Sequence, residues 1–119
     1  MDKISEHFTI KDVDCNCGCG YSLINKQLWT MLENARQLAC VKFIINSWCR
    51  CQKYNDSLPN SVPDSAHIKG LAVDISAKLN KQIILKSLRK AGFKRIGIAK
   101  TFIHIDIDET KPQKEWEYK

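Results

Sequence analysis

Long apolar runs are absent from this 119-residue sequence. No stretch reaches the roughly 18 consecutive apolar residues of a membrane-spanning helix, so we expect no membrane span. The opening residues, MDKISEHFTI, lack the apolar segment of a secretory signal. The expected location is therefore the cytoplasm, or the outside of the cell after release by another route such as cell lysis.

Internal repeats, low-complexity segments and linkers are also absent. The length suits one domain, so we expect a single, monomeric domain over residues 1–119. Hydrophobic residues make up 44% and charged residues 27% of the chain, which is typical of a globular protein with an ordinary core.

The net charge is +6. Such a charge favours an anionic partner, such as nucleic acid or a cell-wall polymer, or is a solvated basic surface. Because the chain has no arginine-rich block and no stripe of basic and aromatic residues, we expect no nucleic-acid partner. A basic, cysteine-containing nucleic-acid-binding domain remains an alternative class, supported only by the charge and the thiols.

The sequence is rich in cysteine. Its six cysteines are Cys15, Cys17 and Cys19 in CNCGCG, the isolated Cys40, and Cys49 and Cys51 in CRC. Without a secretory signal, disulfides are not the default state. The CxCxC spacing differs from the usual CxxC of zinc knuckles, so packing thiols, a second, structural metal ion and disulfides all stay open.

Hydrophobic periodicity predicts two helices and four strands. Apolar residues at helical spacing, from Ile24 to Leu38, predict a helix over Asn25–Ala39. A second helix follows a capping Asn80 and stops at Gly92. The predicted strands are Val41–Ser47, Leu71–Ser76, Arg95–Lys100 and Phe102–Asp108, and Lys53–Ser65 is predicted as a long loop. The expected fold class is α+β, a small antiparallel sheet with helices packed on one side.

Two of these strands carry polar residues on one face only. In Leu71–Ser76, alternation places Asp74 and small residues opposite the apolar face. In FIHIDID, His104, Asp106 and Asp108 share the face opposite three isoleucines. His67 lies just before the first of these strands, where a turn can bring its imidazole over the same face. If the strands pair, a zinc site forms on this polar face.

The set His67, Asp74 and His104 has two histidines and one carboxylate. Three such ligands, with the fourth tetrahedral position open, are the pattern of a catalytic zinc site. Taken singly, each of these residues is more often a surface or hydrogen-bonded group than a ligand, so their combination and spacing carry the prediction.

Four segments resemble the zinc D-Ala-D-Ala metallopeptidases, in their small, phage-type and murein-endopeptidase branch. SAHIKGLAVDI matches the SxHxxGxAxDI motif, and FIHIDID matches the closing FxHxD strand. HFTIKDVDCNCGCG resembles the N-terminal segment of this branch, and IINSWCRCQKYN resembles its SGYRC…N element. The similarity runs from about His7 to Trp116. It implies the fold shared with the hedgehog signalling domain and with lysostaphin-type enzymes.

The resemblance also implies a function. It predicts a zinc-dependent peptidase acting on peptidoglycan stem peptides, as a murein endopeptidase or a D,D-carboxypeptidase of endolysin type, released by lysis if phage-encoded. Zinc would be held by His67, Asp74 and His104. Arg50 stands where the family has an arginine near the substrate, and it would bind a peptide carboxylate or the oxyanion. Ser65 would bind substrate, orient His67 or cap the turn.

The sequence departs from the family at two places. Many members have an acid three residues before the last histidine, as general base, and this chain has Thr101 there. Asp106 would either orient a ligand histidine or move a proton. Trp48 and Cys49 replace a Gly-Tyr pair, which is expected to reshape substrate binding. The missing acid supports an alternative, a non-catalytic zinc-containing module that binds peptide or a partner.

Overall fold

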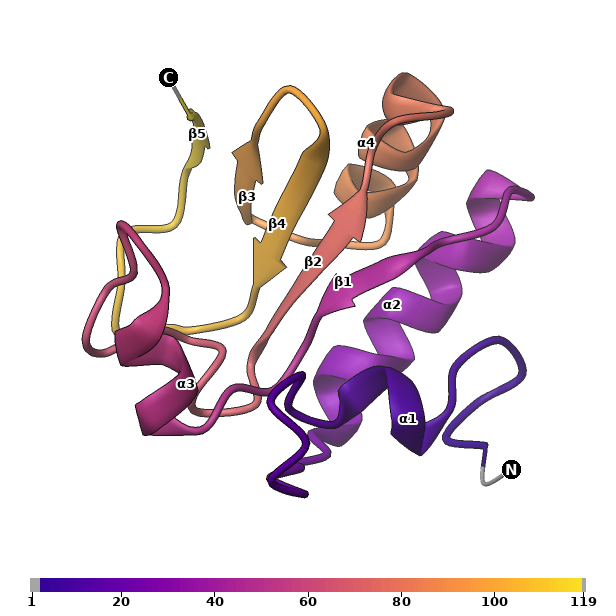
Figure 1. The fold of residues 1–119 in the computed structure, drawn as a ribbon. Coiled ribbons are helices and arrows are strands. Elements are labelled where there is room, and N and C mark those ends of the chain that lie inside the picture. Colours follow the sequence, from indigo (N-terminus) through magenta and orange to yellow (C-terminus); the bar gives the residue numbers. More distant parts are fainter. Residues whose placement is uncertain (1–2, 119) are drawn as a thin grey trace.

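A five-stranded sheet forms the centre of the computed structural model, which describes residues 3–118 (Figure 1). In chain order, the strands are β1 (Ile45–Ser47), β2 (Ala72–Ser76), β3 (Arg95–Ile98), β4 (Phe102–Asp106) and β5 (Glu115–Glu117). They lie in the order β1-β2-β4-β3-β5. The strand β2 therefore lies directly beside β4, which is the pairing that the predicted zinc site on the polar face needs.

The sheet is antiparallel from β1 to β3, as predicted. The strand β5, which was not predicted, instead pairs with β3 in parallel. The chain leaves β4, runs back past the end of the sheet and enters β5 in the direction of β3 (Figure 1). This return brings the segment after β4 to the edge of the sheet.

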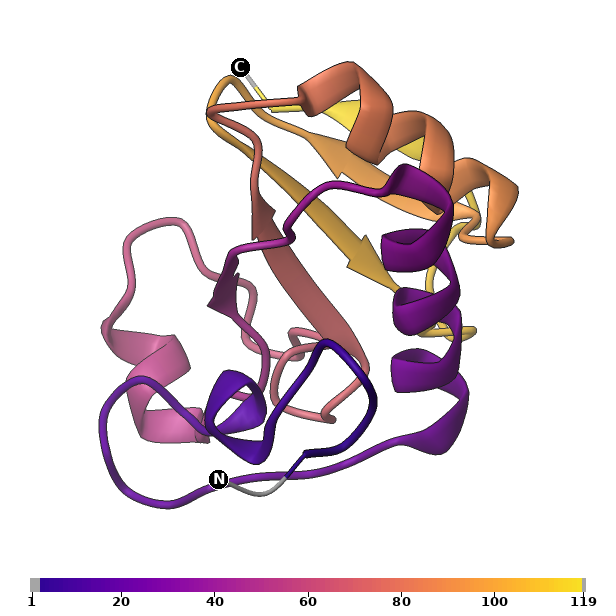
Figure 2. The ribbon, with the colours of Figure 1, turned by 90° about the vertical axis from the view of Figure 1, so that its right-hand side faces the viewer.

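Two of the four helices in residues 3–118 cover one face of the sheet (Figure 2). The helices are α1 (Ile10–Val13), α2 (Lys26–Ala39), α3 (Gln52–Ser57) and α4 (Lys81–Lys90). The helix α2 confirms the prediction for Asn25–Ala39, since the Asn25 side chain accepts a hydrogen bond from the Leu28 backbone N–H at 2.9 Å. The predicted stripe extends too far, because Ile24 and Leu38 are about half exposed.

The core lies between α2, α4 and the apolar face of the sheet. Its sheet members are Val73, Ile75, Ile96, Ile103 and Ile105, and its helical members include Leu28, Leu32, Ala35, Ile84, Leu85 and Leu88. Alternation along β2 and β4 thus buries one face and leaves the other to carry polar groups.

The second helix lies near its predicted place, but its cap differs. Asn80 occupies the N-cap position with a left-handed backbone (φ 62°), and its side chain makes no capping hydrogen bond. Gly92, two residues after the helix ends, has φ 104°, which fits the predicted stop.

Two further predictions need correction. The loop predicted over Lys53–Ser65 begins within α3, which starts where the Cys51 thiol accepts from the Tyr54 backbone N–H, a cap that the sequence pattern did not suggest. The predicted strand Val41–Ser47 is reduced to β1, because only Ile45 and Ser47 are registered against β2.

Within residues 3–118, the helices are all too short or too polar to cross a lipid bilayer.

Candidate metal centre

Three predicted ligands meet on the polar face of the sheet. Asp74 of β2 is registered directly opposite His104 of β4, and His67 lies in the turn that precedes β2. The Asp74 Oδ1 atom is 2.8 Å from His104 Nδ1 and 3.2 Å from His67 Nε2. One donor atom from each residue lies within 4.8 Å of the others.

The imidazole of His67 presents a free lone pair to this cluster. Its Nδ1–H donates to the Trp48 backbone carbonyl at 2.7 Å, which leaves Nε2 without a proton in the neutral ring. Nε2 is buried and makes no hydrogen bond to any residue that the structure describes. A lone pair facing the Asp74 carboxylate is repulsive unless a cation lies between them.

Ser65 shapes the turn that carries His67. Its Oγ accepts from the His67 backbone N–H at 3.2 Å, and the residue is 8% exposed. This hydrogen bond fits the predicted role of Ser65 in capping the turn. Ser65 also lines a cavity beside the candidate ligands, so its role in substrate binding stays a prediction.

Carboxylates hold His104 from both sides. Its Nε2 is 2.7 Å from Asp106 Oδ2, and its Nδ1 points at Asp74. Burial opposes a charge on His104, but the hydrogen bonds to Asp106 and Asp74 outweigh it and raise the pKa of the imidazole. With Nε2–H directed at Asp106, Nδ1 is the nitrogen left to face a metal.

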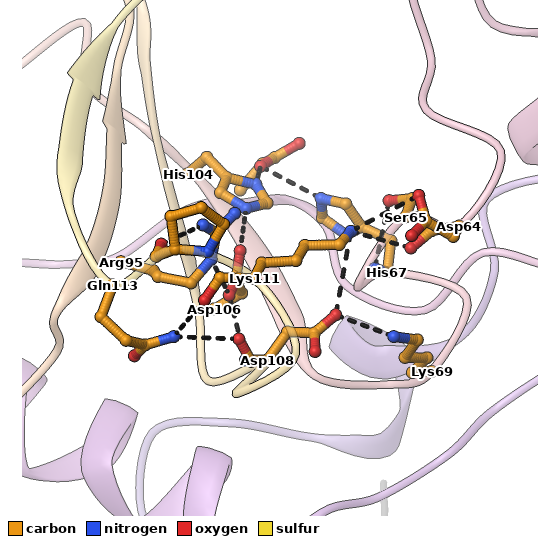
Figure 3. A network of polar contacts seen from close by, with 12 residues as sticks. Asp64, Ser65, His67, Lys69, Arg95, His104, Asp106, Asp108, Lys111 and Gln113 are labelled. Carbon is orange, nitrogen blue, oxygen red and sulfur yellow. Dashed lines mark hydrogen bonds and ion pairs between the residues drawn. The ribbon is translucent and has the colours of Figure 1, made fainter.

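Both oxygens of Asp106 are engaged (Figure 3). Oδ2 accepts from His104, while Oδ1 accepts from Arg95 Nε at 2.7 Å and from the Asp108 backbone N–H at 3.0 Å. Burial alone would raise the pKa of Asp106, but the hydrogen bonds from His104 and Arg95 hold it below its usual range. Asp106 is thus an ionised, buried acceptor for His104.

Arg50 pairs with Asp74. Its Nη2 donates to Asp74 Oδ2 at 3.1 Å, which leaves Oδ1 directed at the histidines. Its Nε donates to Ser47 Oγ at 3.2 Å and its Nη1 to Asn55 Oδ1 at 3.3 Å. Burial would raise the pKa of Asp74, but hydrogen bonding to His104 holds it far below its usual range.

A cavity of about 430 Å³ opens beside these residues. Its cationic lining comes from Arg50, Arg95 and Lys111, and the carboxylates that line it within residues 3–118 are Asp74 and Asp106. Lys111 reaches across to donate to the Asp64 backbone carbonyl at 2.8 Å (Figure 3). The lining therefore has one more cationic side chain than carboxylates, and Arg50 and Arg95 are each paired with one of those carboxylates.

The aromatic wall of this cavity was not predicted. Trp116 of β5 lies 5.6 Å from His104 between ring centroids, and Tyr118 also lines the cavity. Both rings pack over Gly97, where an added Cβ would lie 2.7 Å from each. The alternation of aromatic and charged residues in EWEY agrees with a strand here, but it is too short to predict one alone.

The two family departures lie away from the cavity. Thr101 is exposed in the turn before β4 and does not line the cavity, so it supplies no catalytic group there. Trp48 and Cys49 are buried in the core rather than in the cavity wall. This pair does not line the cavity, so the expected reshaping of substrate binding stays a prediction, and the contact that the structure shows is that of the Trp48 carbonyl with His67.

The donor set fits zinc. Two imidazole nitrogens and one carboxylate oxygen are typical of three-ligand zinc sites, and the lone pair of His67 Nε2 has no other partner among the described residues. His67, Asp74 and His104 would hold the ion, with Asp106 and the Trp48 carbonyl fixing the two rings.

Comparison with known proteins agrees with this geometry. The family model for Peptidase M15 matches residues 6–108, a span that contains Arg50, His67, Asp74, His104 and Asp106. No individual curated protein matches the sequence. Since the match covers most of the chain, the protein belongs to the peptidase M15 family, which supports a zinc metallopeptidase activity.

Proposed function

We propose that this protein is a zinc-dependent peptidase that cleaves peptide bonds in bacterial peptidoglycan. The zinc ligands in this proposal are His67, Asp74 and His104. The observation that carries it is the buried Nε2 of His67, which has no hydrogen-bond partner among residues 3–118 and faces Asp74 and His104 at the wall of a cavity with a small excess of cationic side chains.

A zinc ion bound here would supply Lewis acidity and lower the pKa of a coordinated water. The chain supplies the orientation of the ligands. Three of the five guanidinium N–H groups of Arg50 are used on Ser47, Asn55 and Asp74. The remaining two are free to bind a substrate carboxylate or the developing oxyanion.

The charge of the cavity supports an anionic peptide as substrate. Arg50, Arg95 and Lys111 outnumber the two carboxylates that line the cavity, and a bound zinc ion would add to this excess. Peptidoglycan stem peptides carry free carboxylates, both at D-alanine termini and along the stem. Such groups are attracted into a cleft of opposite charge.

The proposed site has no dedicated general base for proton transfer among the residues that the structure describes. Asp106 is committed to His104, Arg95 and Asp108, so we propose that it positions His104 rather than acting as general base. Without a dedicated base, the rate is expected to be about 10²–10⁴-fold lower than with one. Zinc and Arg50 would then provide most of the transition-state stabilisation.

Mass analysis of digested murein tests this proposal. Zinc-loaded protein is incubated with murein and with soluble muropeptides, and chelator should abolish cleavage that added zinc restores. Release of free D-alanine would indicate a carboxypeptidase, and splitting of cross-links would indicate an endopeptidase. His104→Ala is the matched inactive control. Intact products across pH 5 to 9 from the zinc-loaded protein would contradict the proposal.

A second candidate function is a zinc-containing module that binds cell-wall peptides without cutting them. It is favoured by the exposed Thr101 at the position of the family's acid. Calorimetric titration with muropeptides separates the two, since the module would bind them and leave them uncut.

A further inference from the structure

A second group of metal-binding side chains lies outside the cavity. Four of the six cysteines place their thiols together: Cys15, Cys17, Cys19 and Cys51, with their sulfur atoms all within 4.8 Å of one another. Three come from CNCGCG, and the fourth is the N-cap residue of α3. The loop after α1 passes beside α3, which brings them into contact (Figure 2).

The distances between the sulfur atoms match those of a tetrahedral metal site. Cys15 Sγ is 3.4 Å from Cys17 Sγ and 3.9 Å from Cys51 Sγ, and the last two are 3.7 Å apart. In a tetrahedral ZnS₄ site with Zn–S bonds of about 2.3 Å, the sulfurs lie about 3.8 Å apart. All six cysteines are free thiols in this structure.

The backbone around the cluster also suits thiolates. The Cys51 N–H donates to Cys15 Sγ, the Tyr21 N–H donates to Cys19 Sγ, and the Tyr54 N–H donates to Cys51 Sγ, each at 3.4 Å. Backbone donors that point at sulfur stabilise its negative charge. The donors of these three bonds come from two segments of the chain, the loop at Tyr21 and the start of α3.

The CNCGCG segment can reach this arrangement because of its glycines. Gly18 and Gly20, on either side of Cys19, have φ of 83° and 85°, a left-handed backbone that turns the chain back on itself. The Cys15 N–H then donates to the Tyr21 carbonyl at 2.9 Å, which closes the loop.

We propose that Cys15, Cys17, Cys19 and Cys51 bind a structural zinc ion, separate from the site at His67, Asp74 and His104. Four thiolates leave no open coordination position, which is the pattern of structural rather than catalytic zinc. Soft sulfur ligands in tetrahedral geometry select zinc or iron, and zinc requires no redox partner.

The other two cysteines have different surroundings. Cys49 is buried and exchanges hydrogen bonds with the Leu23 backbone, with its Sγ 3.1 Å from Leu23 N and 3.2 Å from Leu23 O. Cys40 is exposed at the end of α2, where it donates to the Gln37 carbonyl at 3.3 Å. Neither takes part in the cluster, so Cys40 provides a control.

A zinc ion at this site would restrict the movement of the segment that contains Arg50. The Cys49 N–H donates to the Val13 carbonyl at 3.0 Å, and the Arg50 N–H donates to the His67 carbonyl at 3.1 Å. With Cys51 bound to the metal, the residues on both sides of Arg50 would be tied to the N-terminal segment.

Zinc stoichiometry of the full-length protein, purified with reductant under nitrogen, tests the site. We expect two zinc ions per chain in the wild type, one in Cys17→Ser, one in His104→Ala and two in Cys40→Ser. Cys17 is chosen because it is exposed, so its replacement disturbs the core least. A wild-type content of one ion that His104→Ala removes would overturn the proposal.

A thiol titration of the wild type tests the same site without any variant. A mercurial reagent should release one zinc ion as the cluster thiols react, and zinc should slow alkylation of Cys17 and Cys19 at least tenfold. Equal alkylation rates with and without zinc, or a disulfide between cluster cysteines in the reduced preparation, would overturn the proposal. Because every readout counts zinc or thiols, failure here is distinguishable from failure of the proposed peptidase function.

Discussion

Replacing Asp106 with asparagine should weaken zinc binding by reversing the preferred tautomer of His104. In the native site, Oδ2 of Asp106 accepts the Nε2–H of His104 at 2.7 Å, which leaves Nδ1 for the metal. If the NH₂ group of the introduced amide faced Nε2, the ring proton would move to Nδ1, the nitrogen needed for zinc.

The opposite orientation of the amide is no better. Its NH₂ would then face the N–H donors of Arg95 and Asp108, which now lie 2.7 and 3.0 Å from Oδ1. Leaving a buried donor unpaired costs about 1–3 kcal/mol. Loss of a residue that orients a ligand histidine typically lowers metal affinity about 10–100-fold. This corresponds to about 1.4–2.8 kcal/mol at about 1.4 kcal/mol per tenfold change.

Chelator competition measures the zinc affinity of Asp106→Asn, and kcat is measured at saturating zinc. We expect the affinity loss above, with kcat of the zinc-loaded variant falling less than about tenfold. The exposed Glu109→Gln is the matched control, since it makes the same chemical change nearby. Zinc affinity within about twofold of wild type, together with a fall in kcat of about 10² or more, would refute the orienting role and favour proton transfer.

Three further predictions concern the same site. Arg50→Lys should keep fold and zinc while losing about 10–10²-fold in kcat/KM, because lysine lacks the planar fork; unchanged turnover would return Arg50 to a structural ion pair. Gly97→Ala should lower the free energy of unfolding by about 1–3 kcal/mol and shift tryptophan fluorescence, because its Cβ would lie 2.7 Å from the Trp116 and Tyr118 rings. Zinc affinity should fall as pH drops below the raised pKa of His104, by up to about tenfold per unit, because zinc displaces one proton from the imidazole. Protonated His104 stabilises the metal-free protein below about pH 6.5, and this stabilisation is lost as pH rises through the raised pKa. The rise in Tm that zinc causes should therefore be larger at pH 8 than at pH 6.

The strand faces and the main helices were predictable because their patterns are local. Alternation along β4 separates Ile103 and Ile105 from His104 and Asp106 before any partner strand is known. Helical spacing likewise places α2, and the structure adds the cap at Asn25. The motifs around His67 and His104 predicted which residues share the zinc site. The register of β2 on β4, which places Asp74 opposite His104, agrees with that prediction.

Other features depend on segments that are distant in sequence. The helix α3 begins at a thiol, which is a rare cap, so the polar sequence around it predicts a loop. The strand β5 has only three residues and gains its pairing from β3, so its alternation is too short to predict a strand alone. Its Trp116 nevertheless forms a wall of the cavity.

Sequence by itself determined the fold class and the polar face and predicted the three candidate ligands, since each follows from spacing within, or just before, one or two strands. Only the tertiary structure decided what holds them. Arg50 reaches Asp74 across 24 positions, and Cys51 reaches Cys15 across 36. Such contacts depend on strand order and on the path of loops, which set distances between side chains that no local periodicity encodes.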